Sequence, residues 1–240
     1  MFERPHHRRI ATVLATLDAP MLAAHGCYFG GGTAIALSHG EYRESGDIGF
    51  LVSDLSGFRG LRQRVTGLGG FAALARPGAT PVQLREVRAD QYGIRTVLGV
   101  DGVAIKFEIV LEARIVLAAP MPSDQVCGVA MLTALDMAAS KLLANSDRWA
   151  DDSVFSRDVI DLALLQPRGK LLASAIAKAS LAYGCSITAD LARAVQQLRD
   201  REGRLVTCMQ ALQISLPKAL LWQRIRALAA AVAAAGQAGA

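Results

Sequence analysis

The sequence predicts an α+β protein whose first half mixes strands and helices and whose second half is a helical bundle. Short apolar runs typical of strands alternate with helical patterns as far as Pro120 and Pro122. From Leu132 onward every segment repeats its apolar residues at helical spacing, and alanine and leucine, two good helix formers, carry most of the apolar content. We place the boundary between a first domain, residues 1–125, and a second domain, residues 126–240.

The first half is expected to alternate helices and strands, starting with a helix from about Arg8 to Ala24 that ends at Gly26. The elements expected next are a short strand, a glycine turn, a helix from Thr33 to Gly40, a strand DIGFLVS, a helix from Asp54 or Ser56, and strand-like segments VQLREVRA, GIRTVLGV, VAIKFEIV and ARIVLAA. The sequence GVDG is typical of a hairpin turn. In the second half, helices are expected at about 133–145, 151–165, 169–182, 188–201, 203–213 and 217–235.

Composition narrows the class of protein. The net charge of +5 and the pI of about 9.3 suit a polyanionic ligand such as a nucleotide or RNA, but suit an ordinary surface equally well. Four cysteines without a C-x-x-C pair predict buried free thiols in a reducing cytoplasm, not a disulfide frame or a zinc site. The charged N-terminus lacks an apolar signal region, and the alanine-rich tail from Ala227 is too short to span a membrane. We therefore expect a cytoplasmic protein with no membrane segment.

Three consecutive glycines, Gly30 to Gly32, stand between an expected strand and an expected helix. Backbone amides there can approach a phosphate closely, because no Cβ intervenes, and the helix N-terminus and the Thr33 hydroxyl add to the attraction. No lysine follows, so the turn is not a P-loop. A purely structural turn explains the same glycines.

Two expected strands each place a carboxylate where a metal ion could bind. Side chains alternate along a strand, so Asp47 shares a face with Gly49, and Lys106 shares a face with Glu108. If Glu108 lies opposite Asp47, the two carboxylates form a site for Mg²⁺. Taken alone, Asp47 is equally well explained as a cap or surface carboxylate, and Lys106 and Glu108 as a solvated face.

In the second half, Asp158 lies on an apolar stripe of its expected helix. An ionised carboxylate is costly there unless it is paired. Lys141 is the nearest partner in sequence, and Arg148 and Arg157 are others. Asp158 and Lys141 are either an internal salt bridge or site residues that face a cleft between the two halves.

Together these segments resemble one family. FGGGTAIALSHGEYRESGDIGFLVSD is similar to the glycine–glycine–threonine and R-x-S-x-D-x-D-F signature of the AbiEii/AbiGii toxin nucleotidyltransferases, a branch of the polymerase-β-like superfamily. KFE resembles the family's K-x-[DE] strand, and SKLLANSDRWADDSVFSRDVIDLALL resembles its later lysine followed by R-D-x-x-D. The matches come in order from about residue 28 to 165. The resemblance implies a polymerase-β-like nucleotidyltransferase domain with a small mixed sheet, followed by a C-terminal helical bundle.

The resemblance also implies a reaction: two-metal transfer of a nucleoside monophosphate from an NTP to a hydroxyl of tRNA, another RNA or a protein. The nucleotide-binding residues it implies are Gly31, Gly32, Thr33, Ser45 and Lys106. The catalytic residues it implies are Asp47, Glu108, Lys141 and Asp158. Asp47 and Glu108 would hold Mg²⁺ or Mn²⁺, Glu108 would also help to activate the attacking hydroxyl, Lys141 would steady the triphosphate, and Asp158 would lie near the active site. The implied biology is the toxin half of a toxin–antitoxin or phage-defence pair, with a cognate antitoxin as partner.

One departure from the family pattern bears on activity. The pattern has an aspartate where this chain has Gly49, and glycine supplies no metal ligand. Glu44 lies before the strand and Asp54 falls on the other face, so neither replaces the missing carboxylate. Three states follow: a weakened enzyme, a nucleotide-binding pseudoenzyme that acts as a binding module, or an inactivated form of an active parent. An antibiotic-modifying nucleotidyltransferase is a further alternative, which the positive net charge disfavours.

Overall fold

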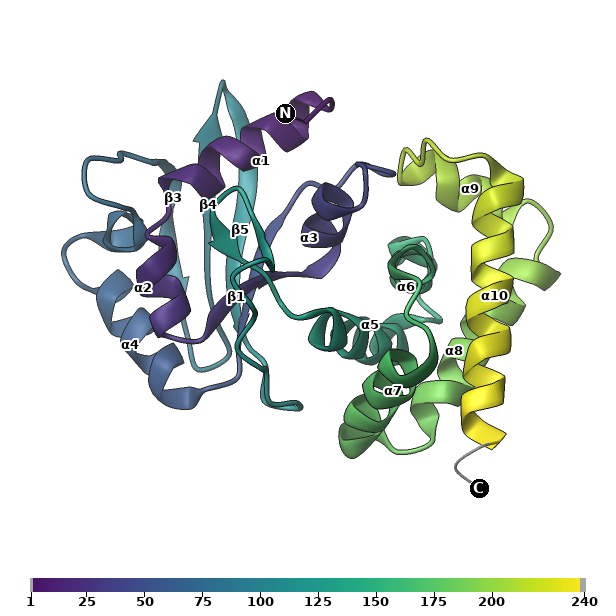
Figure 1. The fold of residues 1–240 in the computed structure, drawn as a ribbon. Coiled ribbons are helices and arrows are strands. Elements are labelled where there is room, and N and C mark those ends of the chain that lie inside the picture. The colour runs from purple at the N-terminus through teal and green to yellow at the C-terminus, as the bar shows by residue number, and fades with distance from the viewer. Residues whose placement is uncertain (1, 238–240) are drawn as a thin grey trace. The chain divides into compact units, whose positions relative to one another are not determined.

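The structure is a computed structural model that describes residues 2–237 (Figure 1). The chain divides into two compact units: unit 1 is Met1–Glu41 with Ser45–Thr133, and unit 2 is Tyr42–Glu44 with Ala134–Ala240. The expected boundary after residue 125 falls inside a small hairpin that belongs to unit 1. A short stretch of the first half, Tyr42–Glu44, is part of the helical unit, which the sequence pattern does not predict.

Unit 1 is a mixed sheet with helices packed on it. Its elements are α1 (Pro5–Thr16), α2 (Ala19–Ala24), β1 (Cys27–Gly30), α3 (Gly31–Ser38), β2 (Ile48–Val52), α4 (Leu55–Thr66), the 3-10 helix η1 (Gly70–Leu74), β3 (Val82–Ala89), β4 (Gly93–Val100), β5 (Val103–Leu111), β6 (Gln125–Val126) and β7 (Val129–Ala130). Within the described residues the main sheet has five strands in the order β1-β2-β5-β4-β3. Strands β2 and β5 are parallel, and the other neighbours are antiparallel.

The two faces of this sheet differ in character. On β2 and β5 the alternate residues are buried, among them Phe50 and Phe107, whose rings lie 5.6 Å apart. Helices α1 and α4 contact this sheet and bury their own apolar stripes (Figure 1). The opposite face of β5 carries Lys106 and Glu108, both exposed, so the predicted alternation is confirmed. The apolar core therefore packs on one face of these strands, and the other face of β5 is polar.

The first predicted helix is wrong in one respect, because the structure breaks it into α1 and α2. Leu17 is extended, with φ −75° and ψ 150°, and the Asp18 carboxylate accepts a hydrogen bond from the Met21 N–H at the start of α2. Asp18 is a good N-cap residue, and its side chain begins a new helix inside a continuous apolar pattern.

Four further features of the structure differ from those predicted from the sequence. Helix α3 begins at Gly31 instead of Thr33. The segment ARIVLAA is not a strand, and the Leu117 N–H donates to the Ser53 hydroxyl instead of to a neighbouring strand. The hairpin β6–β7 was not predicted, because strands of only two residues each are too short to show a periodic pattern. The helix expected from 151 starts only at Arg157, because Phe155 and Ser156 adopt left-handed backbone conformations.

Unit 2 is helical, as predicted. Its elements are α5 (Ala134–Arg148), the 3-10 helix η2 (Asp152–Val154), α6 (Arg157–Leu165), α7 (Gly169–Tyr183), α8 (Ser186–Asp200), α9 (Arg204–Ala211) and α10 (Lys218–Gln237). Helix α5 packs against α6, α7 and α8, and α10 packs against the same three helices. Buried Leu221, Ile225, Leu228 and Val232 form the apolar stripe of α10.

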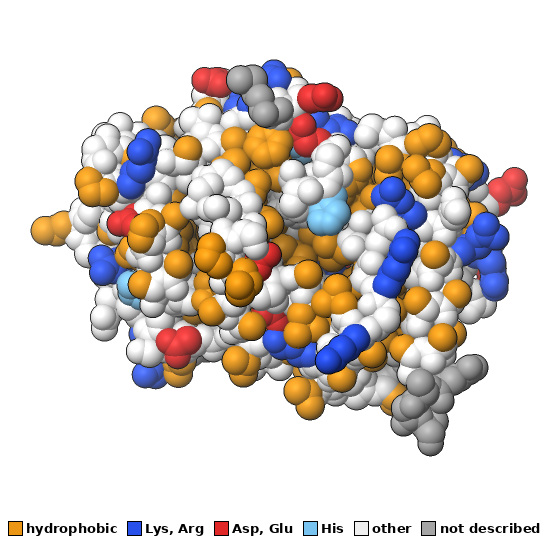
Figure 2. All heavy atoms as spheres, in the orientation of Figure 1, with side chains coloured by type: hydrophobic (Ala, Val, Ile, Leu, Met, Phe, Trp, Pro, Cys, Tyr) orange, Lys and Arg blue, Asp and Glu red, His pale blue; other side chains and the backbone are white. Residues whose placement is uncertain are grey.

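Three surface features relate to the compositional expectations. In the described part of the chain, no single helix is long and apolar enough to cross a membrane; only α7 and α8 taken together reach that length and hydropathy, with a bend of 108° between them. Lys and Arg side chains lie at separate places on the face drawn in Figure 2. The four cysteines are free, and Cys27 and Cys208 are buried as predicted. Contrary to expectation, Cys127 is only partly buried, and Cys185 is exposed because it occupies the turn that begins α8.

Candidate active site

An open cavity of about 680 Å³ lies on the polar face of the unit 1 sheet. This volume is within the range of about 300–1,000 Å³ that is typical of small-molecule sites. The residues that line it are Asp47, Arg85, Glu86, Val87, Arg88, Arg95, Thr96, Val97, Lys106, Phe107 and Glu108. The cavity therefore runs from the start of β2 across β5 and β4 to β3.

The two predicted metal-binding carboxylates both line this cavity. Asp47 directly precedes β2, and Glu108 is the register partner of Gly49 on the adjacent parallel strand β5. Asp47 and Gly49 are two residues apart, so both belong to the face that Glu108 also occupies. An added Cβ at Gly49 would meet only the Gly30 carbonyl oxygen, at 4.0 Å, so the position has room for a side chain.

Basic residues stand beside both carboxylates. Arg95 on β4 pairs in register with Glu108, and its Nε lies 3.9 Å from Glu108 Oε2. Lys106 lies two residues before Glu108 on β5, at the level of Asp47, because Ile48 pairs with the following residue, Phe107. The cavity thus holds four basic and three acidic side chains.

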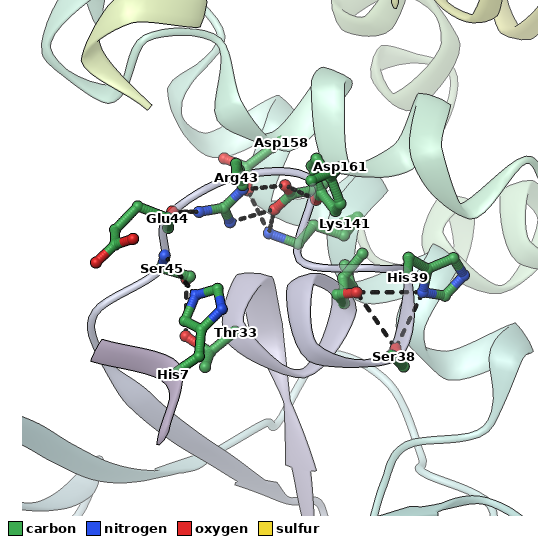
Figure 3. A network of polar contacts seen from close by, with 12 residues as sticks. His7, Thr33, Ser38, His39, Arg43, Glu44, Ser45, Lys141, Asp158 and Asp161 are labelled. Atoms are coloured by element: carbon green, nitrogen blue, oxygen red, sulfur yellow. Dashed lines mark hydrogen bonds and ion pairs between the residues drawn. The ribbon is translucent and has the colours of Figure 1, made fainter. Parts of the chain in front are cut away.

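The segment that carries Asp47 is held by side chains of two helices, Thr33 of α3 and His7 of α1. The Thr33 hydroxyl is buried; it donates to the Asp47 carbonyl oxygen at 2.5 Å and lies 2.7 Å from the Ser45 hydroxyl. The fully buried His7 ring accepts a hydrogen bond from the Ser45 N–H at 3.2 Å (Figure 3). The same ring lies 2.8 Å from the Glu41 carboxylate. Burial raises the pKa of Glu41, but hydrogen bonds from backbone N–H groups and from His7 outweigh it and lower that pKa. Thr33, Ser45 and His7 therefore position Asp47.

The glycine turn supports this segment from the junction of β1 and α3. Gly31 has φ +74°, a conformation that favours glycine over residues with a Cβ. No residue of the turn is among the described residues that line the cavity. Phosphate contacts by Gly31, Gly32, Thr33 and Ser45 stay predictions, because the Thr33 hydroxyl is already engaged with the backbone.

The other two predicted catalytic residues, Lys141 and Asp158, meet in unit 2. The Lys141 ammonium lies 2.9 Å from Asp158 and 2.6 Å from Asp161, and Arg148 binds Asp158 through two hydrogen bonds. Arg43 makes two hydrogen bonds to Asp161 (Figure 3), and the Tyr42 hydroxyl donates to the same carboxylate at 2.5 Å. We call these six residues, Tyr42, Arg43, Lys141, Arg148, Asp158 and Asp161, the unit 2 network.

Electrostatics explain how two carboxylates remain ionised in this buried position. Burial raises the pKa of Asp158, but Lys141 and Arg148 outweigh it and hold that pKa well below its usual range. Burial likewise raises the pKa of Asp161, and Arg43 and Lys141 outweigh it, so that pKa is lowered. The network is an internal ion cluster, and it secures Tyr42–Glu44 to the helical unit. A role of Lys141 and Asp158 at the nucleotide site stays a prediction.

The lowered pKa values predict that unit 2 loses stability in acid. Unfolded aspartate has a pKa of about 3.9, so the contribution of Asp158 and Asp161 is complete above that value and is lost as the pH falls towards their lower folded values. Both tryptophans, Trp149 and Trp222, belong to unit 2, so tryptophan fluorescence reports its unfolding. We expect the urea midpoint to hold from pH 7 to about 5 and to fall below about 4. An equally steep fall in an Asp161→Asn variant would contradict this origin.

Lys141 and Arg148 are the partners that the sequence suggested for Asp158, whereas His7, Arg95 and the pairing of Arg43 with Asp161 were not predicted. Arg43 and Asp161 were visible, since they are the arginine of R-x-S and the second aspartate of R-D-x-x-D. His7 carried no signal, because it lies beside other polar residues near the N-terminus. Arg95 carried none either, because its position opposite Glu108 depends on strand register.

The residues of the cavity fit one divalent ion better than two. Mg²⁺ usually takes one or two carboxylates and completes its shell with water and substrate phosphates, so Asp47 and Glu108 suffice for a single ion. Across residues 2–237, no group of three or more His, Cys, Asp or Glu side chains is gathered in a way that could hold a metal ion. The third carboxylate of the family pattern is missing at Gly49.

Comparison with solved structures identifies the fold. The chain shares its fold with a "putative nucleotidyltransferase" from H. pylori, with a TM-score of 0.52 and 16% identity over 94% of this chain and 92% of that one. It also shares its fold with JHP933 from Helicobacter pylori, with a TM-score of 0.53 and 14% identity over 99% and 94% of the two chains. The predicted α+β fold class is thereby confirmed. No curated protein matches the chain.

The family follows from the sequence match. The family described as "Nucleotidyl transferase AbiEii toxin, Type IV TA system" matches residues 14–231, and the chain belongs to it. This confirms the resemblance drawn from the short motifs, and it extends the match through most of the helical unit. The family is one of nucleotidyltransferase toxins of toxin–antitoxin systems.

Proposed function

We propose that the protein transfers a nucleoside monophosphate from an NTP to a hydroxyl of an RNA or protein acceptor, as the toxin of a toxin–antitoxin or phage-defence pair. The observation that carries the proposal is the pair of carboxylates, Asp47 just before β2 and Glu108 on the parallel neighbour β5, in one open cavity. Family membership supports the reaction class and an antitoxin partner. A cytoplasmic location, where NTPs and tRNA are found, is part of the proposal.

In this mechanism the acceptor hydroxyl attacks the α-phosphorus of the NTP. A new oxygen–phosphorus bond forms, the bond to the bridging oxygen breaks, and pyrophosphate leaves in line. Glu108 accepts the hydroxyl proton, and Asp47 and Glu108 would hold Mg²⁺ or Mn²⁺, which when bound stabilises charge on the phosphate oxygens. Thr33, Ser45 and His7 hold the Asp47 backbone in place. Gly31 and Gly32 would offer backbone amides to phosphate.

Lys141 and Asp158 keep their proposed roles near the triphosphate. Lys141 is bound by two carboxylates in unit 2, so a triphosphate would compete with Asp158 and Asp161 for the ammonium group. A conservative substitution of Lys141 or Asp158 distinguishes a role at the nucleotide site from a structural role in the ion cluster. Loss of transfer with little loss of stability would favour a site role, and the reverse would favour a structural one.

Two rival functions differ in what the cavity must bind. A pseudoenzyme that only binds nucleotide is favoured by Gly49, which leaves the metal site one carboxylate short. An antibiotic-modifying enzyme would need an acidic pocket for a cationic drug, but basic side chains outnumber acidic ones in the cavity. The direct test incubates the wild-type chain and a Gly49→Asp variant with each labelled NTP and total tRNA. Label transfer supports the proposal, and NTP binding without transfer by either chain supports the pseudoenzyme.

Gly49→Asp is expected to raise the affinity for Mg²⁺. The new carboxylate would share a face with Asp47, and the two like charges gain only when a cation neutralises them. An increase of about tenfold in affinity would add about 1.4 kcal/mol of stability at saturating Mg²⁺. The measurement compares thermal unfolding of both chains in Mg²⁺ and in chelator. An equal gain in both conditions would mean that residue 49 affects only the strand, since glycine weakens strands.

A further inference from the structure

Most of the basic residues in the cavity lack an acidic partner. Arg85, Arg88 and Lys106 form no ion pair with any described residue, whereas Arg95 pairs with exposed Asp90 at 3.1 Å and reaches Glu108 at 3.9 Å. We call these four residues the basic row. Surface arginines and lysines are often unpaired, but here the four line one cavity that also contains the proposed reaction site.

Strand register concentrates these charges. Arg88 and Arg95 are register partners on β3 and β4, Arg85 pairs with Val97, and Val97 pairs with Lys106 on β5. Like charges directly opposite each other destabilise a sheet. The Arg88–Arg95 pairing is therefore unfavourable for folding. Asp90 offsets the charge at Arg95 only, and an anion between the two strands would relieve the remaining repulsion at Arg88.

One end of the basic row lies beside the proposed metal-binding carboxylates, where the phosphates of a nucleotide would have to bind. Lys106 stands at the level of Asp47, and Arg95 stands beside Glu108 on the far side from Gly49. Neighbouring strands are about 4.8 Å apart, so β5 to β3 covers about 10 Å. This span and the cavity of about 680 Å³ suit a small polyanion, such as a triphosphate, better than a long polymer.

From this geometry we propose that the basic row binds the triphosphate of an NTP directly, without a divalent ion. Arg95 and Lys106 supply the positive charge that a second metal ion would supply if residue 49 were an acid. The row then explains why basic side chains outnumber acidic ones around Asp47 and Glu108. The inference rests on the proposed function for the identity of the ligand as an NTP, and it changes how that ligand is held.

The test measures equilibrium binding of the four NTPs and of inorganic tripolyphosphate to the full chain, in chelator and in Mg²⁺. For the wild type we expect affinities in chelator within about threefold of those in Mg²⁺, because the contacts are charge-assisted hydrogen bonds from the protein. Arg95→Gln and Lys106→Gln should each weaken binding in chelator by roughly tenfold to a hundredfold. Arg59→Gln is the matched control, since Arg59 is exposed on α4 and outside the cavity. Thermal unfolding shows that each variant folds.

The outcomes separate this inference from the proposed function. Binding that needs Mg²⁺ and is unchanged in Arg95→Gln would overturn the basic row and leave a metal-dependent transferase standing. Binding in chelator that falls in Arg95→Gln and Lys106→Gln but not in Arg59→Gln would support the row, whether or not label is transferred. No binding of any NTP or of tripolyphosphate would overturn both. The triphosphate assignment would be overturned if a short single-stranded RNA binds while tripolyphosphate does not, and if this RNA binding is lost in Arg85→Gln and Arg88→Gln.

Discussion

Asp47→Asn is expected to lower nucleotidyl transfer by at least about a hundredfold. Even residues that only support metal ligands change metal affinity or activity by about 10–100-fold, and Asp47 is proposed as a direct ligand. The asparagine keeps the size of the side chain, and the backbone contacts of this segment come from Thr33, Ser45 and His7, so the fold should persist. The rate is measured with labelled NTP in whichever of the wild type or the Gly49→Asp variant transfers label.

Binding measurements make this prediction sharper. In Asp47→Asn, Mg²⁺ should no longer add to NTP affinity, whereas binding in chelator should persist through the basic row. Glu86→Gln is the matched control, because it removes a carboxylate from the same cavity without touching the proposed metal site. Equal losses of transfer in Asp47→Asn and Glu86→Gln would argue against a metal role for Asp47. A collapsed melting curve in Asp47→Asn would assign the residue to folding instead.

Asp161→Ala is expected to destabilise unit 2 by about 3–5 kcal/mol. Asp161 is fully buried and receives hydrogen bonds from Arg43 and Tyr42 and an ion pair from Lys141. Removing the carboxylate leaves two buried cations next to a single remaining acid, Asp158, which is the costly state for an ion cluster. Urea unfolding followed by the fluorescence of Trp149 and Trp222 measures the effect in unit 2 alone.

Asp200→Ala is the control for this experiment. Asp200 belongs to the same unit and pairs with Arg199 at 2.7 Å, but the pair is half exposed, and exposed pairs contribute little to stability. Asp161→Asn should fall between the two, because it keeps the shape of the side chain and loses the charge. If Asp161→Ala is no less stable than Asp200→Ala, the unit 2 network does not hold the helices together.

Much of the fold could be predicted because the relevant signals are local. The segments VQLREVRA and GIRTVLGV coincide with β3 and β4, since alternation and turn residues act over a few positions. The same holds for the turn at Asp101 and Gly102, whose positive φ angles suit these residue types. Short motifs in the right order were enough to find the family, because the spacing of Thr33, Asp47 and Glu108 reflects one chain path through the sheet.

Features of the fold that depend on side-chain contacts or on distant residues were predicted less completely. The break at Asp18 and the late start of α6 come from side-chain capping and left-handed residues, which periodicity does not register. The Ala113–Ala119 segment has the apolar content of a strand, but it bonds to Ser53 instead of to another strand.

The sequence by itself determined the α+β order, the family, and the candidate carboxylates Asp47 and Glu108. It also showed that the third carboxylate of the family pattern is replaced by Gly49. The tertiary structure decided which charges meet. Strand register placed Arg95 beside Glu108 and opposite Arg88, and the docking of Tyr42–Glu44 into unit 2 brought Arg43 to Asp161. These pairings join residues as far as 118 positions apart. Electrostatic energy depends on distance in space and on burial, and spacing along the chain determines neither.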